Sequence, residues 1–597
     1  MVKILKAPVP PDLSLISILV YNRTQNPQKT TCKTIKGVAT PMKFSEMQYQ
    51  RIDFEKVLSE LKELEEALAN AGSAEEQFAV HQRFYLLQDH VMTQFALATI
   101  RNDINMADDF YSEEKKYYDA ELPGYHAAVV SYKHKLFRSR FRAELTEILG
   151  PVAFKNMELA EKSVNEALIP LMQEENTLAT EYNKLLASAS IDWQGEKKNL
   201  SLMEPYLRHK DRKIRVEAWQ KYTEFFSEHQ EKIDDIYDKL VKNRTAQGQK
   251  MGYDNYLPLG DCRMMRNCYT RSDMQNFRKQ VKKDLVPFAE KLHERRRQRL
   301  GLEKLHYYDE DVYFTNGNPS PIGTPEDILA AGLRMYTELS PETARFMKTM
   351  CDMELFDVAG RPNKRTGGYM TMLPDYKVPF IFANFNGSSG DADVITHECG
   401  HAFQGYLTAA DPIREHNDLT MDIAESHSMP MEFFTNPWME LLFGARAEDY
   451  RTMQFEDAVT FIPYGTMVDE FQEIVYQNPG LTSHERDAVW LDLEKQYRPH
   501  MDYTGNTYLS AGGFWKKQHH IFDLPLYYID YCLAGTNQLQ YKLWMGRDYR
   551  EAWQSYMKLV KLSASDFFNG VVEKAGLINP FEDGCLRYII KKLERDL

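Results

Sequence analysis

Apolar residues recur every three or four positions over long stretches of the chain, which is the repeat of one face of an α-helix. The clearest case is residues 54–68, FEKVLSELKELEEAL, where Asp53 stands in the position of an N-cap. Similar patterns run through residues 212–226, 327–339 and 549–562. These patterns predict a mainly α-helical fold.

The segment before the helix predicted at residues 327–339 has the composition of a loop. Residues 316–327, NGNPSPIGTPED, are rich in glycine and proline, which interrupt regular structure. Thr324 is followed by a proline and two acids, the order expected of an N-cap and the first turn of a helix. We therefore expect a helix to begin just after Thr324.

One segment reads as a β-strand. In residues 377–387, KVPFIFANFNG, the side chains of Phe380, Phe382 and Asn384 share one face. Pro379 cannot donate a ladder hydrogen bond, so we expect an edge strand rather than a central one. An edge strand here could pair with the backbone of an extended peptide, with Phe380, Phe382 and Asn384 as substrate-binding residues.

The first 41 residues differ from the rest in composition and in hydrophobic pattern. They are rich in Pro, Thr, Lys and Asn and show no hydrophobic period. We expect the folded unit to begin near Met42, with residues 1–41 disordered or an upstream extension. The remainder is divided into an N-terminal helical lobe, residues 42–200, and a catalytic region, residues 201–597.

Composition excludes several classes of protein. The net charge of -14 argues against nucleic acid as a partner. No apolar run reaches the roughly 18 residues that span a bilayer, and residues 13–21, LSLISILVY, are too short and lack a cleavage site. The seven cysteines show no CxxC spacing, which is typical of free thiols in a reducing compartment. We therefore expect a cytoplasmic protein.

Residues 395–403, ITHECGHAF, carry the most specific motif in the chain. On a helix His397 and His401 project from nearly the same side, so two imidazole nitrogens can reach one ion about 2 Å away. Glu398 points elsewhere and suits a carboxylate that holds the attacking water. This is the HExxH pattern of zinc peptidases, and composition predicts it by chance about 0.06 times in this chain.

The third protein ligand has to come from further along the chain. The longer HExxHxxGxxH form is excluded, because Gln404 and Leu407 stand where Gly and His are required. Residues 420–434, TMDIAESHSMPMEFF, place three acids along one side of a helix. We choose Glu425 as the third ligand, with Asp422 and Glu432 as hydrogen-bond acceptors for the free ring nitrogens of the two histidines.

Three neighbouring residues are weaker candidates for the ion. Cys399 lies about 200° around the helix from His397, so we interpret it as a small core residue. His427 is separated from Glu425 by a similar angle, and His416 sits in the polar run REHND, which favours a loop.

A second group of candidate residues lies in residues 512–531, GGFWKKQHHIFDLPLYYIDY. A zinc peptidase must stabilise the negative oxygen that forms on the attacked carbonyl, and imidazole and tyrosine hydroxyls are suitable donors. Tyr528 and Tyr531 are three residues apart and can face one groove.

Three segments together resemble a known family: residues 367–404, DIAESHSMPMEFF and QHHIFDLPLYYIDY. They are similar to the M3 family of zinc oligopeptidases, in particular to the oligoendopeptidase F group, and INPFEDGC near the C-terminus agrees. The resemblance implies a two-lobed helical metallopeptidase with a deep central channel and a small β-sheet beside the active-site helix. It also implies a narrow entry that admits short unfolded peptides.

The resemblance also implies roles for individual residues. The zinc ligands would be His397, His401 and Glu425, with Glu398 as general base and then general acid. The residues that match the family's transition-state donors are His520 and Tyr531, with Tyr528 or Tyr527 nearby. The doubled histidine leaves His519 as the alternative to His520.

The resulting hypothesis is a zinc-dependent endopeptidase that hydrolyses internal bonds of short unfolded peptides through a metal-activated water. Two alternatives stay open: a zinc carboxypeptidase or aminopeptidase, and a non-catalytic helical peptide-binding protein. Short peptides are the expected partners, without nucleic acid or membrane, and the oligomeric state is not predicted.

Overall fold

The structure of the chain is a computed structural model that describes residues 41–365 and 367–596. From Lys43 onward the described residues form one compact unit. The expectation for residues 1–41 falls almost wholly outside the described residues, and the lobe boundary after residue 200 stays a prediction. None of the described helices is long and apolar enough to cross a membrane.

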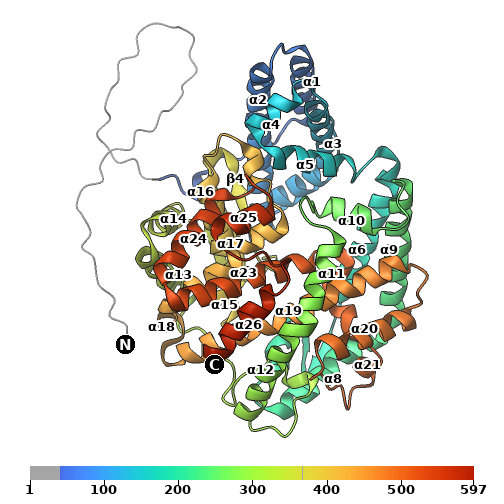
Figure 1. Ribbon diagram of the computed structural model, residues 1–597, viewed down its shortest axis with the longest axis vertical. Coiled ribbons are helices and arrows are strands. Elements are labelled where there is room, and N and C mark those ends of the chain that lie inside the picture. Colours follow the sequence, from blue (N-terminus) through green and yellow to red (C-terminus); the bar gives the residue numbers. More distant parts are fainter. Residues whose placement is uncertain (1–40, 366, 597) are drawn as a thin grey trace. The chain divides into compact units, whose positions relative to one another are not determined.

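The first five helices pack around a hydrophobic core of their own, and α1–α4 stand together at the top of Figure 1. The predicted helix is confirmed as α1, and the Asp53 carboxylate caps it by accepting from the backbone N–H of Lys56. The helices are α1 (Phe54–Asn70), α2 (Ala74–Ile104), α3 (Asp109–Phe137), α4 (Arg142–Leu149) and α5 (Pro151–Glu161).

The next part of the chain is again helical, apart from a short antiparallel hairpin of β1 and β2. The elements are α6 (Ile169–Ala187), β1 (Ile191–Trp193), β2 (Glu196–Lys198), α7 (Leu200–Leu207), α8 (Arg212–Glu228), α9 (Gln230–Lys250), α10 (Leu257–Arg263), α11 (Arg271–Gln280) and α12 (Val286–Arg299). A wide turn of five residues, Val281–Leu285, joins α11 to α12 without a break.

Most of the remaining elements are helices as well. They are α13 (Pro325–Leu339), α14 (Pro341–Asp352), α15 (Gly390–Asp393), α16 (Cys399–Thr408), α17 (Met421–Phe434), α18 (Glu440–Phe443), α19 (Ala447–Gln477), α20 (Ser483–Tyr497), α21 (Thr507–Ser510), α22 (His519–Asp523), α23 (Tyr528–Arg547), α24 (Tyr549–Leu562), α25 (Phe568–Ala575) and α26 (Cys585–Asp596). The predicted start of α13 is confirmed, with Thr324 and Asp327 forming a reciprocal cap. The mainly helical fold class is therefore confirmed.

The predicted strand is confirmed as β5 (Val378–Phe385), but its edge position is wrong. It is the central strand of a three-stranded sheet, between β3 (Phe356–Ala359) and β4 (Tyr369–Leu373). Pro379 is tolerated because it pairs only with Met372 of β4, while the β3 ladder begins two residues later at Ile381.

The central position of β5 changes what this strand can do. At Ile381 and Phe382 both sides of its backbone are paired, so the middle of the strand has no free edge for a peptide. Phe380 and Phe382 are fully buried, and the Asn384 amide donates to the carbonyls of Arg365 and Gly367. The predicted substrate-binding face therefore holds the sheet together.

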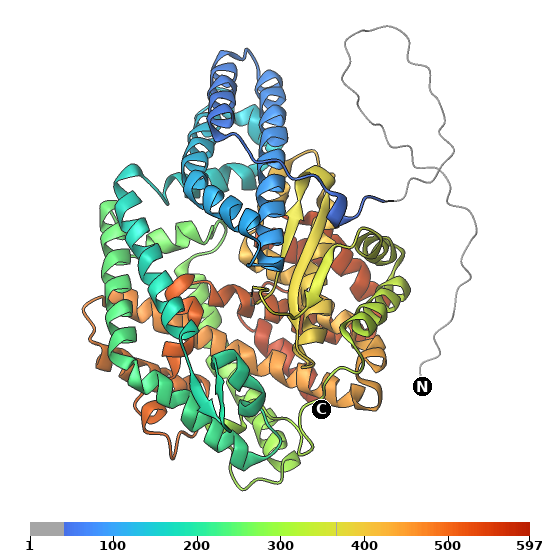
Figure 2. The same ribbon diagram turned by 180° about the vertical axis from the view of Figure 1, so that it is seen from behind.

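The sheet, yellow in Figure 2, supports the helix that carries the histidines. A Cβ on Gly405 of α16 would lie 2.5 Å from the Met372 sulfur, so helix and sheet are in close contact. On the other side α2 lies beside β4, where the Tyr369 hydroxyl donates to the Asp103 carboxylate at 2.8 Å. The small sheet beside the active-site helix is thus confirmed.

Candidate active site

The histidine motif lies on a helix with one irregular turn. The chain runs from α15 through a wide, π-type turn at Val394–Glu398 into α16 without a break. Such turns are frequent at functional sites. His397 and His401 still share one side, with ring centroids 5.0 Å apart, while Cys399 is fully buried on the other.

Helix α17 lies directly against this motif because residue 400 is glycine. A Cβ at Gly400 would lie 2.6 Å from the Cα of Ser428 and 2.9 Å from the carbonyl oxygen of His427. Any larger residue would push the two helices apart. The close approach brings the side chain of Glu425 to the two histidines.

The three predicted ligand residues converge on one point. Nε2 of His397 and Nε2 of His401 lie 3.4 and 3.6 Å from the same Glu425 oxygen, and one ligand atom of each residue lies within 4.8 Å of the others. Two atoms that each lie about 2.05 Å from one ion at a tetrahedral angle are about 3.4 Å apart. The spacing of these donor atoms therefore fits a tetrahedral cation.

A carboxylate behind His397 fixes which ring nitrogen faces this point. Nδ1 of His397 donates to Glu432 at 2.8 Å, and the Gln538 amide donates to the other Glu432 oxygen at 3.0 Å. Burial lowers the pKa of His397, but Glu425 and Glu432 outweigh it and raise the pKa well above 6.5. A bound cation would take the place of the Nε2 proton, and the ring, with its proton kept on Nδ1, would offer a lone pair on Nε2. This is the carboxylate–histidine arrangement that orients metal-binding imidazoles.

The protonation states of the other two residues also fit a cation. Burial alone would raise the pKa of Glu425, but its contacts with His397 and His401 outweigh this effect and lower the pKa to about 2. Burial lowers the pKa of His401 to about 4. At neutral pH the site thus offers a carboxylate and an uncharged imidazole, as a divalent metal requires.

Two residues that hold Glu425 were missed by the sequence analysis in this role. The Tyr527 hydroxyl donates to one Glu425 oxygen at 2.7 Å, and the Ser428 hydroxyl donates to the other at 3.0 Å. Ser428 follows Glu425 by three residues on α17, a spacing that indicates contact. Tyr527 lies about a hundred positions away, and no local pattern connects it to Glu425.

Asp422 does not make the predicted bond to a ligand histidine. Its carboxylate accepts from the Thr420 hydroxyl and, at 2.7 Å, from the backbone N–H of Ile423. It lies in the first turn of α17, where a short acidic side chain bonds most easily to its own backbone. His427 is buried and absent from the ligand group, as predicted.

Glu398 has the properties of a carboxylate that can exchange protons. Burial, with a smaller contribution from the negative charge of Glu425, raises its pKa despite the opposing effect of His397. No residue in the described part of the chain hydrogen-bonds to its carboxylate. A carboxylate with a raised pKa and no partner suits a general base.

The second predicted group comes to the same place from α22 and α23. Helices α16, α17 and α23 lie side by side, as Figure 1 shows. The His520 ring centroid lies 4.8 Å from that of Tyr528 and 6.2 Å from that of Tyr531, and the charge of Glu425 acts on the pKa of His520. Glu425 and Glu398 both act on the pKa of Tyr531, which burial raises.

The neighbouring histidine points elsewhere. The His519 side chain is 55% exposed, and its Nδ1 lies 3.2 Å from the Asn183 amide oxygen and 3.9 Å from the Asp523 carboxylate. The structure thus brings His520, and not His519, to the tyrosines.

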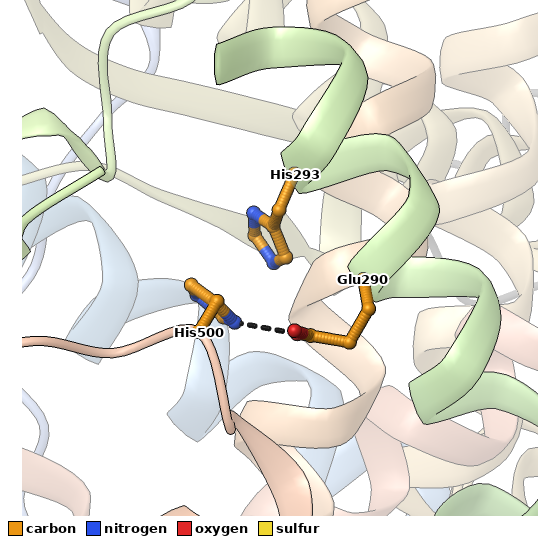
Figure 3. A group of neighbouring side chains, drawn as sticks. All are labelled: Glu290, His293 and His500. Carbon is orange, nitrogen blue, oxygen red and sulfur yellow. Dashed lines mark hydrogen bonds and ion pairs between the residues drawn. The ribbon is translucent and has the colours of Figure 1, made fainter. Parts of the chain in front are cut away.

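A second group of metal-binding residue types lies outside this site. Glu290 and His293 extend from α12, and His500 lies in the loop after α20 (Figure 3). The two imidazole rings stack, with centroids 3.5 Å apart and planes 25° from parallel.

Hydrogen bonds, rather than an ion, account for this second group. Nδ1 of His500 lies 2.8 Å from Glu290, and its Nε2 lies 3.1 Å from Glu310. Ionised carboxylates only accept, so both nitrogens of His500 carry protons. Arg296 donates to Nδ1 of His293, which places the proton of that neutral ring on Nε2, where an ion would need a lone pair.

Fold and site together define a helical metallopeptidase, and comparisons with known proteins give the family. A model of the peptidase M3 N-terminal domain matches residues 44–164, and one of peptidase family M3 matches residues 205–321 and 337–587. No curated protein matched. The chain belongs to peptidase family M3 and falls in its oligoendopeptidase F group; it is a metalloendopeptidase.

Three solved structures illustrate this relationship. An oligoendopeptidase F and PZ peptidase A crystallised with an inhibitor are each 42% identical to the chain, with a TM-score of 0.87. An oligoendopeptidase F from Bacillus anthracis is 38% identical, with a TM-score of 0.83. In all three cases the similarity covers 93% of this chain and 98% of the other.

Proposed function

We propose that the protein is a zinc-dependent endopeptidase that hydrolyses internal bonds of short unfolded peptides in the cytoplasm. The observation that carries the proposal is the convergence of His397, His401 and Glu425 at the spacing of one cation, beside Glu398. The free thiols of the six described cysteines support a reducing compartment.

His397, His401 and Glu425 would hold the zinc, and Glu432 and Tyr527 would orient two of these ligands. A bound zinc ion supplies Lewis acidity, which makes water a nucleophile near neutral pH and polarises the substrate carbonyl. With three protein ligands, such a site would keep a position for water or substrate.

Glu398 is the proposed general base. Its raised pKa brings it closer to neutral pH, where proton uptake and release are both efficient. It takes the proton of the attacking water and later gives it to the leaving amine. The absence of a fixed partner among the described residues leaves its oxygens free for this exchange.

His520 and Tyr531, with Tyr528 beside them, are the proposed donors to the carbonyl oxygen as negative charge develops there. Burial lowers the pKa of His520 to about 4 and raises the pKa of both tyrosines. All three are therefore uncharged at neutral pH, with N–H and O–H groups available to donate.

The proposed substrate is a short unfolded peptide, in keeping with the oligoendopeptidase F group to which the chain belongs. An extended peptide presents its backbone to the donors without unfolding.

The decisive experiment is cleavage of an end-blocked, internally quenched peptide by the wild type and by Glu398→Ala. We expect the variant to keep its bound zinc and to lose turnover by about 10³-fold or more, because the general base is gone. Glu63→Ala, at an exposed glutamate on α1, is the matched control and should leave both zinc content and turnover unchanged.

The products and the metal separate this proposal from its alternatives. Mass spectrometry of an end-blocked peptide shows internal cleavage for an endopeptidase and none for a carboxypeptidase or aminopeptidase. A chelator should abolish turnover, and zinc should restore it. Unchanged turnover in Glu398→Ala would reject the assigned base.

A further inference from the structure

The proposed donor His520 is held by a chain of two other side chains. The Gln518 amide nitrogen lies 2.9 Å from Nδ1 of His520. The amide oxygen of Gln518 accepts a hydrogen bond of 2.7 Å from the Tyr464 hydroxyl. Tyr464 lies on α19, so the chain links that helix to the start of α22.

The direction of these hydrogen bonds follows from their chemistry. The Tyr464 hydroxyl has one proton to donate, and in the described part of the chain the Gln518 oxygen is its one hydrogen-bond acceptor. An amide whose oxygen faces Tyr464 turns its nitrogen toward His520. An amide nitrogen only donates, so Nδ1 of His520 accepts and carries no proton.

This arrangement selects one tautomer of His520. With Nδ1 unprotonated, the neutral ring carries its proton on Nε2. Within residues 41–365 and 367–596 no group hydrogen-bonds to Nε2 of His520. The Nε2–H group is therefore left free to donate into the site.

We propose that Gln518 is a positioning residue that holds His520 as the Nε2–H tautomer, so that this ring donates to the developing oxyanion. Tyr464 in turn fixes the orientation of the Gln518 amide. This inference rests on the proposed function, in which His520 is a donor, and adds two residues to it. The opposite tautomer would present a lone pair to the oxyanion and repel it.

The surroundings of the two residues keep this chain rigid. The Arg498 guanidinium lies over the Tyr464 ring, 5.2 Å from its centroid.

The segment before Gln518 is held by Asp487. The Asp487 carboxylate accepts hydrogen bonds from the Trp515 indole at 2.8 Å and from the Lys516 ammonium at 3.0 Å. A Cβ on Gly512 would lie 2.4 Å from the Asp487 carbonyl oxygen, so the loop packs closely there. Donors held in place before reaction stabilise a transition state most effectively.

Gln518→Leu and Gln518→Glu test the inference by removing or reversing the bond to Nδ1. Gln518→Leu should lower kcat about 10-fold or more with KM within about threefold, since a donor lost in the transition state costs turnover. Gln518→Glu turns the donor into an acceptor, so Nδ1 takes up a proton. Turnover of this variant should then fall as pH rises through the raised pKa of His520, because the neutral ring keeps its proton on Nδ1 and loses the Nε2–H donor. A purely structural role would not produce this alkaline limb.

Tyr464→Phe and His519→Gln are the companion variants. Tyr464→Phe frees the Gln518 amide to rotate and should lower kcat less than Gln518→Leu does. His519→Gln changes an adjacent exposed histidine and should leave kcat at neutral pH unchanged. Thermal midpoints within a few degrees of wild type show that all variants are folded.

His520→Ala distinguishes failure of this inference from failure of the proposed function. It should lower kcat about 10²–10³-fold, and adding Gln518→Leu should cost little more, because both act through one ring. A full loss in His520→Ala with wild-type kinetics in both Gln518 variants would overturn the inference alone. Wild-type turnover in His520→Ala would remove the donor role and the inference with it.

Discussion

Two clusters in this chain each combine two histidines with a glutamate, yet only one of them has the geometry of a metal site. In the first cluster, Nε2 of His397 and Nε2 of His401 lie 3.4 and 3.6 Å from one Glu425 oxygen. At Glu290 and His500 the atoms are 2.8 Å apart, a hydrogen-bond length, and the imidazole rings stack.

The groups behind the histidines explain the difference. Glu432 accepts from the far nitrogen of His397, so the near nitrogen has a lone pair for a metal. In the other cluster carboxylates accept from both nitrogens of His500, and Arg296 donates to His293. Residue type alone therefore does not identify a metal site; the partner of the second ring nitrogen decides.

Removal of one histidine from each cluster gives the largest expected contrast. His401→Ala should abolish zinc binding and lower turnover by about 10³-fold or more, because a ligand of the catalytic metal is lost. His500→Ala should keep the metal content and a turnover within about twofold of wild type. Elemental analysis and peptide cleavage measure both, and one equivalent of zinc lost from His500→Ala would refute the comparison.

The carboxylates behind the histidines give the next contrast. Glu432→Gln should weaken zinc binding about 10–100-fold, because the amide no longer holds the His397 proton as firmly. Glu310→Gln makes the same change behind His500 and should leave zinc affinity unchanged. Competition with a chelator measures both affinities, and equal values in the two variants would contradict the assignment.

The pH dependence of thermal stability tests whether His500 in the second cluster is protonated. Burial lowers the pKa of His500, but Glu310 and Glu290 outweigh it and raise the pKa above its ordinary value of 6.5. The proton thus stabilises the fold fully below pH 6.5, and this contribution is lost as pH rises through the folded-state pKa. Between pH 7 and 9 the wild-type thermal midpoint should fall further than that of His500→Gln, by about 1–3 °C. His484→Gln, at an exposed histidine, should behave as wild type.

Asp422→Asn should give the smallest effect. Asp422 shares a helix side with Glu425, but its carboxylate bonds to Thr420 and Ile423. Zinc affinity should therefore stay within about twofold of wild type. If Asp422→Asn instead lowered zinc affinity as much as Glu432→Gln in the same competition assay, Asp422 would have to support a ligand histidine after all.

Features set by local chemistry could be predicted from the sequence. The helix at residues 54–68 and the caps at Asp53 and Thr324 follow from spacing and from hydrogen bonds between residues close in the chain. The convergence of Glu425 on the motif was also predictable in outline, because acids on one side of a helix have few other interpretations among apolar neighbours.

Features set by distant partners could not be predicted in this way. β5 was expected at an edge because Pro379 lacks a donor, but the β3 ladder starts only beyond it. Tyr527 and Gln538 hold acids of α17 from more than a hundred residues away, and only the packing of α17 against α23 reveals them.

The wide turn at residues 394–398 has a consequence for how this enzyme can change over time. It accommodates one residue more than a regular helix would, and the first histidine lies within it. Deleting a single residue there would rotate the residues before the turn by about 100° around the helix axis relative to α16. Insertions and deletions there should therefore be far less tolerated in a lineage that keeps its activity than point substitutions on the outer surface of the same helix.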